Sequence, residues 1–249
     1  SVTTEQTKTE KPARLGPIGR RNFMLLMIGM TVYHSAWNMQ AVTRAPLINW
    51  LGMSNKVYGL MGSAWALCMI GSFLFPVLSR RYPRKKWFQF VITMPYLAAD
   101  LALGLAIVIA MMTGSHEWLL PVTIGIMVYW PFAAGWTLGP QSEYIANCIP
   151  KTHIGRFVSM QQVCVGLVSV GASAAITVLM NIMGVPARYA AACLVAYGLA
   201  LIALVIPLFA HETPMPTPPP EPFWRPAVHA VRHDPIFRRM LGAGMILWM

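Results

Sequence analysis

Two ionisable side chains lie inside long apolar stretches, where binding or proton chemistry is a common reason to keep a charge. Asp100 stands near the middle of the apolar run 87–112, with no basic residue within a helical turn. His34 stands about midway along the run 23–46, inside the polar stretch 33–38. A charged group in hydrocarbon costs about 3 kcal/mol unless it faces a cavity or a partner. Both residues are therefore candidates for a polar pathway.

Each of these residues has more than one interpretation. Asp100 can line a cavity or join two helices, it can make a structural hydrogen bond while protonated, or the apolar run around it can be bounded differently. Neutral His34 can hydrogen-bond across helices, contact a ligand, or ligate a pigment or metal. The structural role is favoured for His34, and neither a metal site nor a cofactor is predicted.

Three amides extend the set of candidates. Asn38 follows His34 by one helical turn, while Gln161 and Gln162 lie near the start of the apolar run 157–183. Amides within a membrane bind a solute or hydrogen-bond neighbouring helices. The candidates for a substrate pathway are therefore His34, Asn38, Asp100, Gln161 and Gln162.

The sequence lacks the patterns that carry catalysis. It contains no phosphate-binding loop, no nucleophile elbow and no Cys/His metal pattern. The four cysteines are widely spaced, which indicates small core residues rather than a disulfide framework. An enzymatic activity is not expected.

The elements that hold these residues are predicted to be membrane helices. Hydrophobic residues make up 56% of the chain and charged residues 11%, against about 25% charged in an ordinary soluble domain. Six apolar stretches are long enough to cross a bilayer, and a seventh reaches about half the required length. They are 23–46, 57–78, 87–112, 118–142, 157–183 and 187–210, followed by 240–249. The sequence therefore predicts an all-α, polytopic integral membrane bundle of six transmembrane helices plus a partial seventh.

Basic residues fall almost entirely in alternate loops, with only Arg44, Lys56 and Arg188 near the ends of the others. They are Lys8, Lys11, Arg14, Arg20 and Arg21 before the first run, Arg80, Arg81, Arg84, Lys85 and Lys86 after the second, and Lys151 and Arg156 after the fourth. Because such residues stay in the cytoplasm, we expect a cytoplasmic N-terminus. The membrane is expected to be a bacterial inner membrane. Membrane lipids, not nucleic acid, then account for the net charge of +11. Arg44 can attract an anionic solute or anchor at the headgroups, and the anchor is favoured.

Four regions follow from this organisation. They are a cytoplasmic tail (1–21), the transmembrane bundle (22–210), a Pro-rich basic cytoplasmic linker (211–239) and the start of a seventh apolar segment (240–249). The prolines of the linker favour extended chain. Its second part, 224–239, mixes apolar and basic residues, which suits a helix on the membrane surface or a solvated connector. The short seventh run suggests either that a C-terminal half is missing from this sequence or that the last residues form a short hydrophobic anchor.

Two local stretches are similar to motifs of one known family. One is PVLSRRYPRKK at 76–86, and the other runs from YIANCIP at 144–150 to Gly155 and Arg156. In these stretches and in its plan of spans, the chain from about residue 20 to 249 resembles the N-terminal half of a major facilitator superfamily transporter. The resemblance implies two six-helix halves enclosing a midplane site.

The first stretch departs from the signature loop of that family. Arg80 stands in place of the usual acid, and Pro76 and Pro83 stand in place of glycines. The resemblance marks the signature-loop and gating residues, which are Arg80, Arg81, Arg84, Lys85 and Glu143. Glu143 is expected to pair with Arg80, Arg81 or Arg84 in place of the lost contact, or simply to be solvated. Proton antiport is not implied, because the fourth run has no embedded Arg.

The function implied by the resemblance is movement of a small solute across the membrane by a half-transporter. Since alternating access needs two halves, we expect a second half, a homodimer partner or a larger membrane complex. The alternative is a non-transporting accessory or assembly subunit of a respiratory or photosynthetic complex. A transporter is expected to show Asp100 and His34 facing an aqueous cavity, whereas a scaffold is expected to have these positions filled.

Overall fold

All regular secondary structure in the described residues is helical, in agreement with the predicted fold class. The computed structural model describes residues 15–54, 56, 59, 79, 82–213, 232, 233 and 235. The chain divides into two units, Ser1–Met215 and Pro216–Met249, and every helix given below belongs to the first. The predicted run 240–249, all of the run 57–78 except residue 59, and nearly all of the predicted linker lie outside the described residues.

Five long helices and one short 3-10 helix follow one another in this part of the chain. They are α1 (Pro17–Trp50), α4 (Lys85–Thr113), α5 (Leu119–Cys148), α6 (Lys151–Ile182), α7 (Ala187–Val205) and η1 (Ile206–Phe209). Four segments, α4, α5, α6 and Ala187–Phe209, are long and apolar enough to cross a membrane. The structure is therefore that of a membrane-type helical bundle. The predicted first run lies within α1, which is not among those four because of its polar middle.

The helix ends follow from local residue types. Pro17 suits the first position of α1, where its missing N–H has no intrahelical partner. Gly114 ends α4 in the left-handed conformation, with φ of 69°, which costs glycine no steric strain. Lys85 and Lys151, expected in loops, instead open α4 and α6. A cation in the first turn opposes the helix dipole, so α4 needs an anion nearby.

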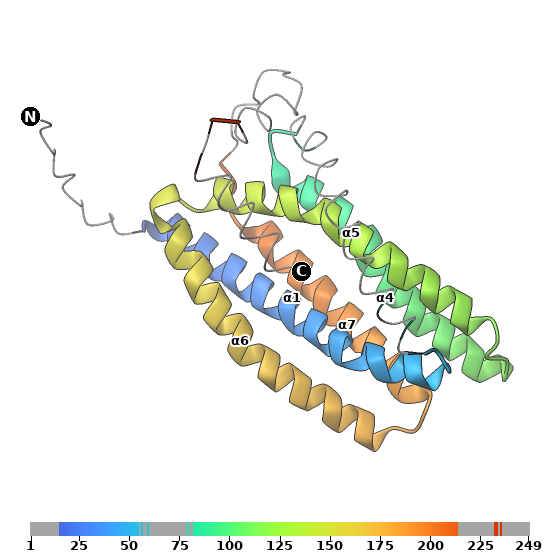
Figure 1. Ribbon diagram of the computed structural model, residues 1–249. Coiled ribbons are helices and arrows are strands. Elements are labelled where there is room, and N and C mark those ends of the chain that lie inside the picture. Colours follow the sequence, from blue (N-terminus) through green and yellow to red (C-terminus); the bar gives the residue numbers. More distant parts are fainter. Residues whose placement is uncertain are drawn as a thin grey trace, which may run out of the picture. The chain divides into compact units, whose positions relative to one another are not determined.

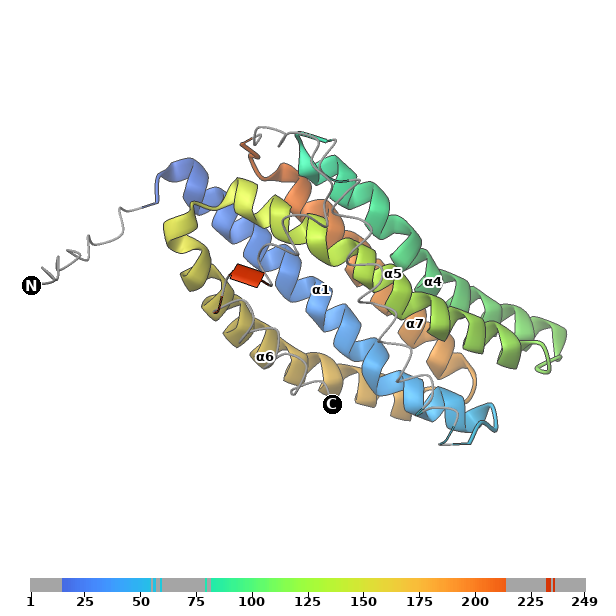
Figure 2. The same ribbon diagram turned by 45° about the horizontal axis from the view of Figure 1, so that its top comes forward.

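The helices pack in a row, α5 on α4, α4 on α7, α7 on α1 and α1 on α6. Figure 1 and Figure 2 show α6 on one side of the bundle and α4 on the other, with α1 and α7 between them. Within the most apolar 18-residue stretch of each helix, 50% of the stretch is buried in α4 but only 11% in α6. α6 is therefore an edge helix whose apolar outer side suits hydrocarbon. We call the end where α1, α4 and α6 begin the proximal end, and the opposite end the distal end.

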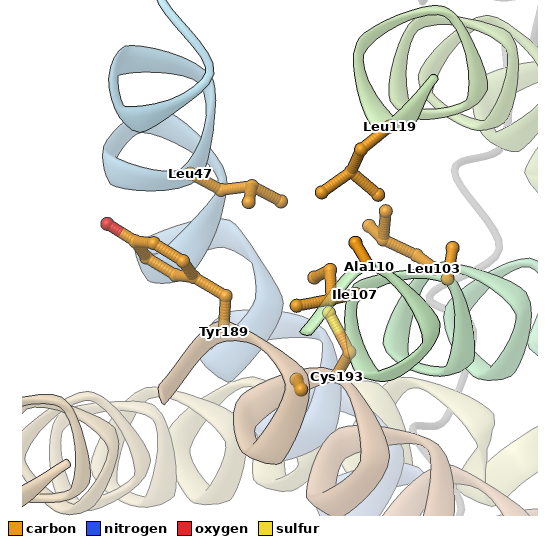
Figure 3. Close-up of a cluster of buried hydrophobic side chains, with 9 residues drawn as sticks. Leu47, Leu103, Ile107, Ala110, Leu119, Tyr189 and Cys193 are labelled. Atoms are coloured by element: carbon orange, nitrogen blue, oxygen red, sulfur yellow. The ribbon is translucent and has the colours of Figure 1, made fainter. Parts of the chain in front are cut away.

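The distal ends of four helices meet in one apolar cluster. Its labelled members are Leu47, Leu103, Ile107, Ala110, Leu119, Tyr189 and Cys193 (Figure 3). The hydroxyl of Tyr189 points away from the cluster and donates a hydrogen bond to the carbonyl of Pro46 over 3.1 Å. Apolar packing fixes this end of the bundle, and most of the polar side chains described below lie elsewhere.

Candidate functional site

Asp100 lies in the interior of the described bundle rather than on its lipid-facing side. Its side chain on α4 is 5% exposed. The Gln40 amide lies beside the carboxylate, and Arg44 is close enough for its charge to act on it. Oδ2 of Asp100 and Oε1 of Gln40 have no hydrogen-bond partner in the described part of the chain. Each of the two side chains thus keeps one buried acceptor with bonding capacity left over.

Arg44 is held by an aromatic ring inside the bundle. Its Cζ lies 3.2 Å from the centroid of the Trp130 ring, and Trp130 is 4% exposed. Stacking on this buried indole holds the half-buried guanidinium against the bundle, and anchoring of Arg44 at lipid headgroups stays a prediction. The charges of Arg44 and Asp100 offset each other across α1 and α4.

Two tyrosines extend this polar region toward the proximal end. The rings of Tyr96 and Trp130 stack with their centroids 5.6 Å apart. The ring centroids of Tyr33 and Tyr96 lie 6.3 Å apart. Together with the previous residues they form what we call the polar-aromatic track. Its members are Tyr33, Gln40, Arg44, Tyr96, Asp100 and Trp130.

Tyr33 also lines a pocket between α1, α4, α5 and α7. The pocket has a volume of about 50 Å³. Its polar lining comes from Tyr33, Lys86, Gln89, Thr93, Thr137, Gln141 and Tyr144. We call this the proximal pocket. Neither Asp100 nor His34 lines this pocket. The aqueous cavity expected around those two residues stays a prediction.

A second polar cluster fastens the proximal end. The carboxylate of Glu212, which is 6% exposed, accepts hydrogen bonds from the backbone N–H groups of Lys85 and Lys86. Asn147 of α5 donates to the same carboxylate over 2.9 Å. This anion at the start of α4 offsets the two lysines there. Asn22 of α1 completes the cluster by exchanging hydrogen bonds with the backbone of His211, at 2.7 and 2.8 Å.

Glu143 forms an ion pair with Lys85, with Nζ and Oε2 3.1 Å apart. The hydroxyl of Ser79 donates to the same oxygen over 2.8 Å, and Lys85 Nζ also donates to the Ser79 carbonyl. The partner of Glu143 in the described residues is thus Lys85 and not Arg84, which is exposed. The expected alternatives Arg80 and Arg81 lie outside the described residues.

The remaining candidates are scattered rather than gathered with Asp100. Asn38 donates to Ser169 of α6 over 2.6 Å and so joins α1 to α6. His34 is partly buried with its ring edge-on to Tyr33, 5.8 Å between centroids. Gln161 is buried on α6, whereas Gln162 is exposed. These four residues remain predictions as pathway residues.

Sequence reasoning missed Glu212, Trp130 and Gln40 as members of the polar clusters. Glu212 could have been recognised from the sequence, since it is an acidic residue at the end of an apolar run in a chain with only eight acidic residues. Trp130 could not have been recognised in this way, because interfacial tryptophans are common in membrane helices. The described residues contain no group of three or more His, Cys, Asp or Glu able to hold a metal ion.

Comparison of the chain with protein-family models, curated proteins and solved structures finds no match.

Proposed function

We propose that this protein is a transporter half of the major facilitator type, which moves a small solute across a membrane together with a second half. In this proposal six spans and the start of a seventh are present, and the proximal end faces the cytoplasm. The observation that carries the proposal is the polar-aromatic track inside an otherwise apolar bundle. Buried ionisable groups in membrane helices are expensive and commonly mark the path of a solute or ion.

The track has hydrogen-bonding groups to spare. Besides Asp100 Oδ2 and Gln40 Oε1, Trp130 Nε1 has no hydrogen-bond partner among the described residues. Buried polar atoms are paired in most proteins, and leaving one unpaired costs about 1–3 kcal/mol. A passing solute or water that donates to the two oxygens and accepts from the indole N–H removes this cost.

The proposed movement uses the two ends of the bundle differently. A solute enters the proximal pocket at Tyr33 and reaches the Asp100 and Arg44 charges by way of Tyr96. Rocking of this half against a second half then exposes the solute to the other side. Arg44 and Asp100 are charges of opposite sign, and Gln40 is neutral, so the track does not exclude a solute of either sign.

A non-transporting assembly subunit is the second candidate, and the small size of the proximal pocket favours it. At about 50 Å³, the pocket holds a few water-sized groups, and Asp100 is almost fully covered. The exposed apolar side of α6 then packs against other proteins of a larger complex. Residues on this side include Val163, Leu167, Val170, Val178 and Ile182.

Native mass spectrometry of the protein, gently purified from its own membrane, separates the two candidates. A dimer, or association with one further six-helix half, supports transport. Stoichiometric association with a large multi-subunit assembly contradicts the transporter proposal and supports the assembly subunit.

A further inference from the structure

We propose that the proximal pocket binds a short-chain primary amide, a small neutral molecule that donates hydrogen bonds. The assignment rests on the transport function proposed above and names its class of solute. The pocket has a volume of about 50 Å³. Because one water-sized group needs roughly 10–15 Å³ of such space, about four non-hydrogen atoms fit, as many as acetamide has.

The spare polar atom of the pocket is a hydrogen-bond acceptor. Gln89 lines the pocket and is 8% exposed, yet its Oε1 has no hydrogen-bond partner among the described residues. The Thr93 hydroxyl donates its hydrogen to the Gln89 main-chain carbonyl over 2.7 Å. Its oxygen therefore accepts from Gln89 Nε2, over 3.1 Å, which fixes the orientation of the amide. A ligand that pairs with Gln89 must donate a hydrogen.

Two hydroxyls of the lining have likewise given their hydrogens to the main chain. The Thr137 hydroxyl donates to the Ala134 carbonyl over 2.8 Å, and the Tyr144 hydroxyl donates to the Pro207 carbonyl. The oxygens of these hydroxyls keep the capacity to accept. Both groups therefore add acceptors to the pocket and no donors, which favours a ligand with several N–H groups.

A charge of either sign on the ligand is disfavoured. Lys86 is the one cationic side chain among the described residues that line the pocket, and none of those residues is acidic. Lys86 is half-buried, and its backbone N–H donates to the Glu212 carboxylate. A cation meets the charge of Lys86, whereas an anion meets the Gln89 acceptor and gains little from an ammonium that is partly solvated. The ligand is therefore neutral.

A primary amide fits each part of this lining. One of its N–H groups donates to Gln89 Oε1 and the other to a hydroxyl oxygen such as that of Thr137, whereas a short alcohol has only one hydrogen to donate. The walls of the pocket include Leu26, Phe90 and Leu208. Such apolar walls cover the methyl end of a small amide.

Saturation-transfer difference NMR on the full chain in lipid nanodiscs measures the binding of acetamide, with empty nanodiscs as the blank. Acetone, acetate and acetamidinium are the matched probes, because they share the planar shape, the size and the methyl group of acetamide. Acetone lacks the N–H donors, acetate is an anion and acetamidinium is a cation. Acetamide is expected to bind about three- to tenfold more tightly than each of them, the effect of one hydrogen bond.

Gln89→Met removes the spare acceptor and keeps a side chain of similar length. It is expected to weaken acetamide binding about three- to tenfold and to leave acetone binding unchanged, because acetone donates nothing to Gln89. Thr123→Val is the control, since it removes a buried hydroxyl of α5 outside the pocket and is expected to leave acetamide affinity unchanged. If Gln89→Met fails to fold, the four probes on the unaltered protein decide the assignment.

Three outcomes overturn the assignment: no acetamide binding, equal binding of any of the three matched probes, or equal effects of Gln89→Met and Thr123→Val. Failure of the transport proposal looks different. Acetamide binding without uptake above that of empty liposomes contradicts transport and leaves the site intact. Uptake of other solutes without acetamide binding contradicts the site and leaves transport intact.

Discussion

Asn147, near the end of α5, donates a hydrogen bond over 2.9 Å to Glu212, which follows η1. The same carboxylate accepts the first backbone N–H groups of α4. One acid therefore ties three helix ends together at the proximal end. It also supplies the negative charge that the lysine-rich start of α4 lacks in its own sequence.

Glu212→Gln is expected to lower the free energy of unfolding by about 1–3 kcal/mol, because a neutral amide neither offsets the helix dipole nor accepts every donor at once. Thermal unfolding of the purified protein in detergent measures the change. Glu117→Gln is the control, since Glu117 is an exposed acid between α4 and α5, and it is expected to change stability by less than about 0.5 kcal/mol. Equal shifts for both variants contradict the role given to Glu212.

The Lys85–Glu143 pair is expected to show a coupling energy of about 1 kcal/mol in a double-mutant cycle of Lys85→Met and Glu143→Gln. The value is modest because the Glu143 side chain is 35% exposed, although that of Lys85 is 10% exposed. The same cycle with Arg84→Met in place of Lys85→Met is expected to give a coupling near zero. A larger coupling for Arg84 restores the pairing first expected from the sequence.

Gly29 permits a close approach between α1 and the end of the α7 segment. A Cβ at Gly29 lies 2.7 Å from Pro207 Cγ and 3.1 Å from the Ala203 carbonyl oxygen. Gly29→Ala is therefore expected to destabilise the bundle by about 1–3 kcal/mol, measured by thermal unfolding.

Gly166→Ala provides the matched control for Gly29→Ala. Nothing lies within 4 Å of a Cβ at Gly166, and alanine is the better helix former. This variant is expected to be neutral or to stabilise by up to about 1 kcal/mol. If the two substitutions have the same effect, the close packing at Gly29 does not contribute to stability.

The positions of the long apolar helices could be predicted from the sequence, but the partners of the buried polar side chains could not. Long apolar runs predicted α4, α5, α6 and α7, because length and hydropathy decide a membrane helix locally. Asp100 stood out as an ion in hydrocarbon, but its neighbours Gln40 and Arg44 depend on how α1 packs against α4. The hydrogen bonds of Glu212 at the proximal end likewise form only because α4, α5 and the segment after η1 meet there.

Asp100 is expected to reduce stability in favour of function. Replacing both charges, as in Asp100→Leu combined with Arg44→Met, removes a buried carboxylate that has an unpartnered oxygen together with the cation that offsets it. This double variant is expected to unfold at the same or a higher temperature. Thr123→Val is the comparison, because the Thr123 hydroxyl, also buried, is bonded within its own helix at 2.8 Å. A clear loss of stability in the double variant, with none in Thr123→Val, assigns Asp100 and its pairing with Arg44 a structural role instead.

Uptake of radiolabelled solutes into proteoliposomes, with a panel of primary amides, monocarboxylates, amines and polyols, tests transport most directly. The account predicts that the protein, reconstituted with its second half, accumulates at least one solute above empty liposomes. It also predicts that Asp100→Asn, which keeps the side-chain volume, reduces that uptake about tenfold or more while the protein stays folded. Uptake equal to that of empty liposomes, or equal uptake by the protein and Asp100→Asn, contradicts the account.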